Sequence, residues 1–243
     1  PFMRLVKTGS LFGVALSLAA AGCGGKDESG SEHAHETELP ATLTIFPSKI
    51  FIGFDGTNMY KAPIIAVSNK KAVTWTIDDP TVASLDTASK DPPAEADGIN
   101  LMLSALKAGN TKLHATDGTQ QAEATVTVLT YTKTQYDAGK ARYAKGPNDK
   151  NPACMECHAP GKGPDHTPTE LDADTDEEIQ DTFVSGKDPE GRPVDYEHNF
   201  TTLLKGYTHM WEVTPDEKVG LVAYLRALKP LAFPEYDAPT TEK

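Results

Sequence analysis

The stretch "AEATVTVLT", residues 122–130, decides the fold of the first half of the chain. Its Ala124, Val126 and Val128 alternate with polar residues, so the apolar side chains fall on one face of an extended backbone. This period of two is what a half-buried β-strand requires. The stretch therefore predicts a strand that rests one face on a hydrophobic core.

Seven further segments of β-rich composition precede this stretch, and turn residues separate them. They are residues 41–46, 49–54, 62–68, 72–77, 81–86, 100–106 and 111–116. Short strands at this spacing predict a β-sandwich over residues 41–130, with Trp75 as a candidate core residue between the sheets. The region contains no cysteine, so no disulfide can join the two sheets.

Two parts of this region resemble the bacterial Ig-like domains of the group-2 type found in surface proteins. They are VTWTIDDPTVASLD at residues 73–86 and LSALKAGNTKLHATDG at residues 103–118. The resemblance extends over nearly all of residues 41–130 and implies a spacer or an adhesion module. The region shows no cluster of His, Asp or Cys that would carry chemistry.

The N-terminal residues 1–22 are typical of an export signal. A short positive start at residues 3–7 precedes an apolar run at residues 11–21, which is too short to span a bilayer comfortably. The small residues before Cys23 resemble the lipobox of bacterial lipoproteins, which implies that Cys23 is lipidated and becomes the mature N-terminus. The alternative is ordinary signal cleavage that leaves Cys23 unmodified.

Residues 23–40 lack any apolar period and are rich in Gly, Ser, Glu and His, so they predict a flexible, lipid-anchored tether. The signal and the anchor together predict a cell-envelope protein on the periplasmic or cell-surface side, attached to the membrane through its N-terminal lipid. The formal net charge of −12 disfavours nucleic acid as a partner, because no basic surface is available to neutralise phosphates.

From Tyr131 onward the hydrophobic period lengthens to about three and a half residues, which indicates helices. Three helices are expected, each beginning after a threonine that precedes an acidic residue by three positions. The three threonines are Thr134, Thr175 and Thr214. The third helix is the best defined, with an apolar stripe that runs up to Pro230.

The most specific motif in the chain is Cys154-Met-Glu-Cys157-His158. A zinc site would need two more N or S ligands, and the remaining cysteine, Cys23, is far away. A thioredoxin-like pair would need a βαβ context, which this region lacks. In haem attachment, two cysteines add across the porphyrin vinyl groups and the next histidine binds the iron. The motif therefore predicts one covalent haem c, attached to Cys154 and Cys157, with His158 as the proximal iron ligand.

Residues 131–232 resemble a class I c-type cytochrome, and residues 233–243 form a C-terminal tail. The resemblance rests on Gly139 and Tyr143, on the cysteine motif, and on VTPDEKVGLVAYLRALKP at residues 213–230. It implies an all-α cytochrome c fold whose first and last helices cross at Gly139. The expected fold class is thus two domains, an all-β Ig-like sandwich followed by an all-α cytochrome c fold.

The same resemblance implies a methionine ligand on the opposite face of the haem iron. Met155 lies inside the motif and cannot reach that face, so Met210 is the candidate, and it would raise the reduction potential. The neighbouring His209 is the rival and would give bis-histidine ligation. His166 and His198 are interpreted as exposed loop histidines, with a place near the haem edge as the alternative.

The function expected from these features is electron transfer at the cell envelope by one covalent haem c that cycles between Fe(III) and Fe(II). The partners would be redox proteins, and the acidic run at residues 172–181 would meet a basic docking face on them. Two alternatives remain. One is a haem-based sensor or haem enzyme with a displaceable sixth ligand, and the other is a surface binding protein whose Ig-like domain carries the function.

Overall fold

The computed structural model describes residues 42–67, 73–86, 100–147, 152–158, 165–194 and 209–231. The predictions for the signal segment, for Cys23, for the tether, for the C-terminal tail and for His198 concern residues outside these ranges. Within the ranges, no helix combines the length and the apolar character needed to cross a membrane.

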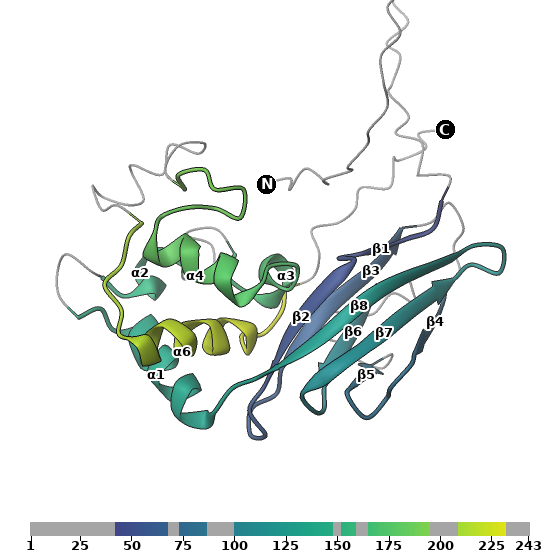
Figure 1. The fold of residues 1–243 in the computed structure, drawn as a ribbon, viewed down its shortest axis with the longest axis horizontal. Helices are drawn as coiled ribbons and strands as arrows, with labels where there is room; N and C mark the ends of the chain where they lie inside the picture. The colour runs from purple at the N-terminus through teal and green to yellow at the C-terminus, as the bar shows by residue number, and fades with distance from the viewer. Residues whose placement is uncertain are drawn as a thin grey trace, which may run out of the picture. The chain divides into compact units, whose positions relative to one another are not determined.

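Eight strands form two four-stranded sheets (Figure 1). One sheet has the order β1-β3-β6-β5 and the other has the order β2-β8-β7-β4. Every strand pair is antiparallel except β2 with β8, which run parallel over six residue pairs. The strands are β1 Thr44–Phe46, β2 Lys49–Phe54, β3 Lys61–Val67, β4 Thr74–Ile77, β5 Ala83–Asp86, β6 Asn100–Ala105, β7 Gly109–Thr116 and β8 Gln121–Thr130.

The alternating apolar residues of β8 face the hydrophobic core, as the sequence predicts. Ala124, Val126 and Val128 are buried, and they share a hydrophobic cluster with residues of the opposite sheet such as Ile64 and Leu103. The intervening residues of β8 point to the other face of the sheet, where Thr125 is exposed and Thr127 is half-buried. Each of the eight expected strand segments overlaps a strand of the structure, so the sequence pattern located this part of the fold correctly.

The described residues contain five helices after the strands, and two of them, α4 and α6, begin where the sequence indicates. They are α1 Lys133–Ala144, α2 Cys154–His158, α3 Pro168–Leu171, α4 Asp176–Val184 and α6 Pro215–Arg226. Thr175 and Thr214 form the expected capping boxes with the glutamates three residues later. The first cap differs, because Thr132 and not Thr134 closes a capping box with Gln135. The Gln135 side chain can close this box because its amide oxygen, like a carboxylate oxygen, accepts the backbone N–H of Thr132, here at 2.9 Å.

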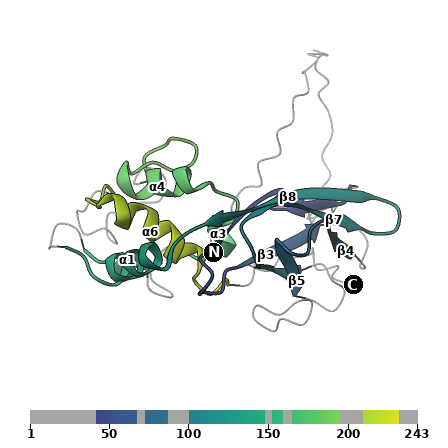
Figure 2. The ribbon, with the colours of Figure 1, turned by 60° about the horizontal axis from the view of Figure 1, so that its bottom comes forward.

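Helices α1 and α6 lie side by side and meet through two glycines (Figures 1 and 2). A Cβ atom added to Gly139 would lie 1.8 Å from the carbonyl oxygen of Gly220. A Cβ atom added to Gly220 would lie 2.2 Å from the carbonyl oxygen of Gln135. The two backbones are therefore in direct contact, and neither position has room for a side chain.

The expected fold class is wrong in its second part. The described residues form a mostly β structure with a few short helices, and no cytochrome c fold follows the sandwich as a separate all-α domain. The helices are only 4 to 12 residues long. Their buried residues, such as Phe183 and Leu221, belong to the same hydrophobic cluster as the sheet residues. Residues Thr37–Lys243 accordingly make one compact unit.

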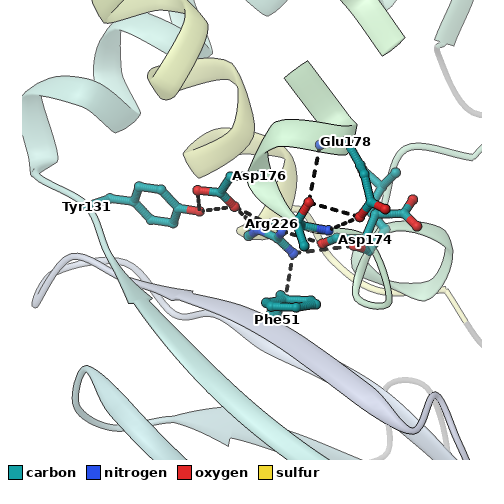
Figure 3. Close-up of polar contacts among 8 residues, drawn as sticks. Phe51, Tyr131, Asp174, Asp176, Glu178 and Arg226 are labelled. Carbon is teal, nitrogen blue, oxygen red and sulfur yellow. Dashed lines mark hydrogen bonds and ion pairs between the residues drawn. The ribbon is translucent and has the colours of Figure 1, made fainter. Parts of the chain in front are cut away.

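A buried arginine provides the polar part of the contact between the helices and strand β2 (Figure 3). Arg226 is only 1% exposed, and its Nη1 donates a 2.7 Å hydrogen bond to the carbonyl oxygen of Phe51. Its Nη2 donates to the carbonyl oxygen of Asp174 at 2.7 Å, and its Nε donates to Asp176 Oδ1 at 3.0 Å. Because its donors meet a carboxylate and several carbonyls, the charge is buried without being left unpaired.

The same carboxylate accepts a hydrogen bond from a buried tyrosine at the end of β8. Tyr131 Oη donates to the two oxygens of Asp176 at 2.7 and 2.8 Å. Burial raises the pKa of the Tyr131 phenol well above its usual range, Asp176 adds to the increase, and Arg226 partly opposes it. Burial and Asp55 likewise raise the pKa of Tyr60.

We expect these two phenols to make stability fall in alkaline solution. The unfolded chain releases their protons near pH 10, while the folded chain holds them to higher pH. Their contribution is therefore fully present below about pH 10 and is lost as the pH rises further. An alkaline titration of the folded protein, followed by tyrosine absorbance, should show two fewer phenols with a raised pKa in Tyr60→Phe/Tyr131→Phe than in the wild type. Ordinary titration of all eight tyrosines in the folded wild type would contradict this expectation.

Candidate functional site

Helix α2 carries the two thiols and the imidazole of the cysteine motif within five residues. The backbone N–H of Glu156 donates to the carbonyl oxygen of Ala153 at 3.0 Å, and Tyr143 Oη lies 3.3 Å from the carbonyl oxygen of His158. Cys154 and Cys157 are both half-buried, and no disulfide joins them. The motif thus presents two thiols and one imidazole from a single short helix.

Helix α1 lies against this motif through a buried arginine. Arg142 is 2% exposed and its Nη1 donates to the carbonyl oxygen of Pro152 at 3.3 Å. Among the described residues, its Nε and Nη2 atoms find no hydrogen-bond partner. Burial raises the pKa of the Cys154 thiol, and the charge of Arg142 partly opposes that increase. The Cys154 thiol is therefore protonated at neutral pH.

The structure brings together His158 and His166, which are eight positions apart in the sequence, and His209, which follows 43 positions later. The ring of His158 stacks on the ring of His166 with 3.4 Å between the centroids and 22° between the planes. The ring planes of His209 and His158 are inclined at 71° to each other, with 6.2 Å between the centroids. Trp211 packs against His209 and Tyr143 packs against His166. The motif histidine therefore lies within a group of imidazoles and aromatic rings.

His166 is not the exposed loop histidine that the sequence interpretation favours. Its Nδ1 atom is buried and has no hydrogen-bond partner within the described structure. Burial lowers the pKa of His166 well below its usual range, and the neighbouring His158 and His209 lower it further. His166 is therefore neutral at physiological pH. The sequence contains no periodic signal for this position, because His166 precedes a four-residue helix, α3.

The two rival iron ligands occupy different environments. His209 is 7% exposed, and its Nδ1 lies 2.7 Å from the carbonyl oxygen of Thr182 in α4. Met210 is 58% exposed. The backbone N–H of Trp211 donates to the carbonyl oxygen of Phe183 at 2.8 Å, which fixes this segment against the last turn of α4. The histidine thus faces the interior and the methionine faces solvent.

Gly186 lets the chain pass close to this segment. It has a φ of +64°, and an added Cβ atom would lie 2.9 Å from the carbonyl oxygen of His209. We expect Gly186→Ala to lower the free energy of unfolding by more than the matched change Gly191→Ala. Gly191 also has a positive φ, +78°, but open space around it, so that change costs about 1 kcal/mol from backbone strain alone. Denaturant midpoints of the two variants give the comparison, and equal midpoints would show that the close approach is absent.

The donor atoms present fit a haem in their chemistry. Two thiols on α2 match the two thioether bonds, and a neighbouring imidazole matches an axial ligand. The described residues hold no group of three or more His, Cys, Asp or Glu that could bind a metal ion by itself. That finding addresses free metal ions, whereas haem iron takes four ligands from the porphyrin and at most two from protein. The predicted roles of Cys154, Cys157 and His158 therefore stay predictions.

Comparisons with known proteins give only distant structural similarities. No protein-family model and no curated protein sequence matches the chain. Domains 4 and 5 of the S-layer protein SbsC are similar at a TM-score of 0.27 and 15% identity, over 36% of this chain and 51% of that one. The M1 domain of titin is similar at a TM-score of 0.27 and 8% identity, over 37% of this chain and 94% of that one.

A third similar structure is the sialic acid binding region of a Streptococcus sanguinis SK1 adhesin. Its TM-score is 0.30 at 12% identity, over 40% of this chain and 30% of that one. The chain spans about half the length of the SbsC structure named above. Similarities of this strength are too low to transfer a function.

These findings correct the interpretation of residues 131–232 as a class I c-type cytochrome. The described helices pack into the same core as the β-sheets, so they do not form the separate all-α domain that this interpretation requires. The description of the chain as an electron-transferring cytochrome c is accordingly withdrawn.

Proposed function

We propose that the chain is an exported protein of the cell envelope whose β-sandwich acts as a surface binding module. The observation that carries the proposal is the contrast between the two faces of the sheet β2-β8-β7-β4. Its inner face is filled by packed aliphatic side chains such as Val126 and Leu113, which are fully buried. Any ligand of the sandwich must therefore bind to its outside.

The outer face of this sheet carries polar and charged side chains on β7 and β8 and directly after the end of β4. Lys112 and Glu123 form an ion pair at 2.8 Å, and His114 Nε2 lies 2.9 Å from Asp78 Oδ1. Thr127 donates a hydrogen bond to Asn110 at 3.0 Å. Hydroxyl, amide and charged groups in one plane can form many hydrogen bonds with an extended polar ligand such as a glycan. The proposed role, binding at the cell surface, is of the kind that the names of the S-layer and adhesin structures above indicate for those proteins.

The test uses the full chain on a glycan array and in sedimentation with isolated cell-envelope fragments. We expect binding to at least one glycan class or envelope fraction, and at least a tenfold loss in Lys112→Ala/Thr125→Ala. The matched control is Lys61→Ala, which removes a lysine that pairs with Asp86 on the other sheet. No binding by the wild type, or an equal loss in the control, would refute the proposal.

A second candidate function is supported by the histidine group around the cysteine motif. We propose that Cys154 and Cys157 hold one covalent haem c, with His158 as an axial ligand. The supporting observation is that the half-buried motif histidine His158 has two imidazoles beside it. Its ring centroid lies 3.4 Å from that of the neutral His166 and 6.2 Å from that of His209. A haem bound here would supply a redox-active iron.

The test of this second candidate is the mass and the visible spectrum of the full chain after export in cells that attach haem to proteins. The expected mass increase is that of one haem, and it should disappear in Cys154→Ala/Cys157→Ala. A wild-type protein that is exported, folded and free of haem would remove this candidate. The sandwich proposal does not depend on this result.

A further inference from the structure

We infer that His209, and not Met210, is the second protein ligand of the haem iron. This inference rests on the proposed attachment of haem at the cysteine motif. The spacing of the imidazoles provides the first argument. Metal–imidazole bonds of about 2.0 Å place the ring centroids of two ligands on opposite sides of one ion about 6 Å apart. The rings of His158 and His209 have their centroids 6.2 Å apart.

The distance between ring centroids also distinguishes His209 from the other nearby histidine, His166. The centroid of His166 lies only 3.4 Å from that of His158, and the two planes are 22° from parallel. Two stacked rings at that distance leave no room for an ion and a porphyrin between them. His166 therefore packs on the ligand His158 and does not bind from the opposite side.

The hydrogen bond of His209 prepares one ring nitrogen for a metal. A carbonyl oxygen can only accept, so the 2.7 Å contact with Thr182 requires the proton on Nδ1 of His209. The lone pair is then on Nε2. Histidines that ligate metals usually donate their other ring N–H to a carbonyl or carboxylate, which fixes both the tautomer and the ring orientation. His209 already has this arrangement.

The backbone on either side keeps the histidine in place. Trp211 donates its backbone N–H to the carbonyl oxygen of Phe183, the residue that follows Thr182. Two consecutive carbonyls of α4 therefore bind the His209 ring and the Trp211 backbone. Gly186 also packs closely against the backbone carbonyl of His209. Met210 lies between the two held residues with its side chain 58% exposed. The held backbone thus presents the Met210 side chain to solvent and the His209 ring, which is 7% exposed, to the interior.

The experiment compares ligand variants of the full, haem-loaded chain by electron paramagnetic resonance and visible spectroscopy. We expect wild type to give a low-spin Fe(III) signal of two imidazole ligands, and Met210→Ala to leave it unchanged. His209→Ala should become high-spin, and added imidazole should restore the low-spin spectrum. His209→Met should stay six-coordinate with a higher reduction potential, since a thioether favours Fe(II).

Other outcomes overturn the inference. Loss of the low-spin signal in Met210→Ala, with retention in His209→Ala, would assign the methionine. Loss in His166→Ala alone would assign His166. If His209→Ala does not fold, the potential of His209→Met decides, because an unchanged potential contradicts ligation by His209. Failure of the haem proposal itself is recognised separately, since the wild type would then carry no haem.

Discussion

Gly139→Ala should destabilise the protein by about 3 kcal/mol or more, among the largest effects of any single-methyl addition in the chain. The added carbon would lie 1.8 Å from the carbonyl oxygen of Gly220, and a backbone atom cannot move aside as a side chain can. Relief requires α1 and α6 to separate, which would open the core around Leu221 and Val222. Urea denaturation followed by circular dichroism gives the change in the free energy of unfolding.

The matched control for this change is Lys140→Ala. Lys140 follows Gly139 in the same helix and is exposed, so its replacement should change stability by no more than about 0.5 kcal/mol. Gly220→Ala should resemble Gly139→Ala, because its added carbon would lie 2.2 Å from the carbonyl oxygen of Gln135. A Gly139→Ala protein as stable as the control would show that the two helices are not in backbone contact.

Arg226→Ala should cost about 3–5 kcal/mol, because it leaves a carboxylate and several buried carbonyl oxygens without their donor. Arg226 is 1% exposed, and its partner Asp176 is 27% exposed and also accepts from Tyr131. Arg226→Lys should recover little of the loss, since one ammonium group cannot reach oxygens on both Phe51 and Asp174. The free energy of unfolding measures both variants.

The control for Arg226 is an exposed arginine with two carboxylate partners. Arg192 pairs with Asp188 and Glu190 but is 48% exposed, so Arg192→Ala should cost no more than about 1 kcal/mol. Equal costs for the two arginines would contradict the assigned role of Arg226.

The two tryptophans can show whether the helices and the sheets still unfold together in Arg226→Ala. Trp75 lies in β4 and Trp211 lies beside α4, so proteins that keep only one of them report on the sheets or on the helices. We expect coincident unfolding transitions with Arg226 and separate transitions in Arg226→Ala. Separate transitions in the wild type would mean that the helices and the sheets do not unfold as one unit.

The local elements of this fold were predictable, and the physical reason is that each depends on neighbouring residues only. The alternation in residues 122–130 located β8, and Thr175 and Thr214 located the starts of α4 and α6. Gly139 was expected at a helix crossing, and it does lie there. What the pattern did not contain is the fold class of the second half of the chain.

The contacts that join the helices to the sheets depend on residues far apart in sequence. Arg226 and Phe51 are separated by 175 positions, and nothing in the periodicity of α6 marks one arginine of its last turn as buried. The same limit applies to the histidine group, where His158 and His209 meet only through the tertiary fold. The resemblance to class I c-type cytochromes led to the prediction of a separate all-α domain. In the structure, the helices share a hydrophobic core with the sheets.

The parallel pairing of β2 with β8 has a mechanical consequence. β2 lies near the start of the sandwich and β8 ends it, so a force that pulls the two ends of the sandwich apart slides these strands past each other. Six residue pairs, from Lys49 with Thr125 to Phe54 with Thr130, then bear the load together and do not open one after another. The sandwich is built to resist extension along the chain, a useful property for a module held at one end and loaded at the other.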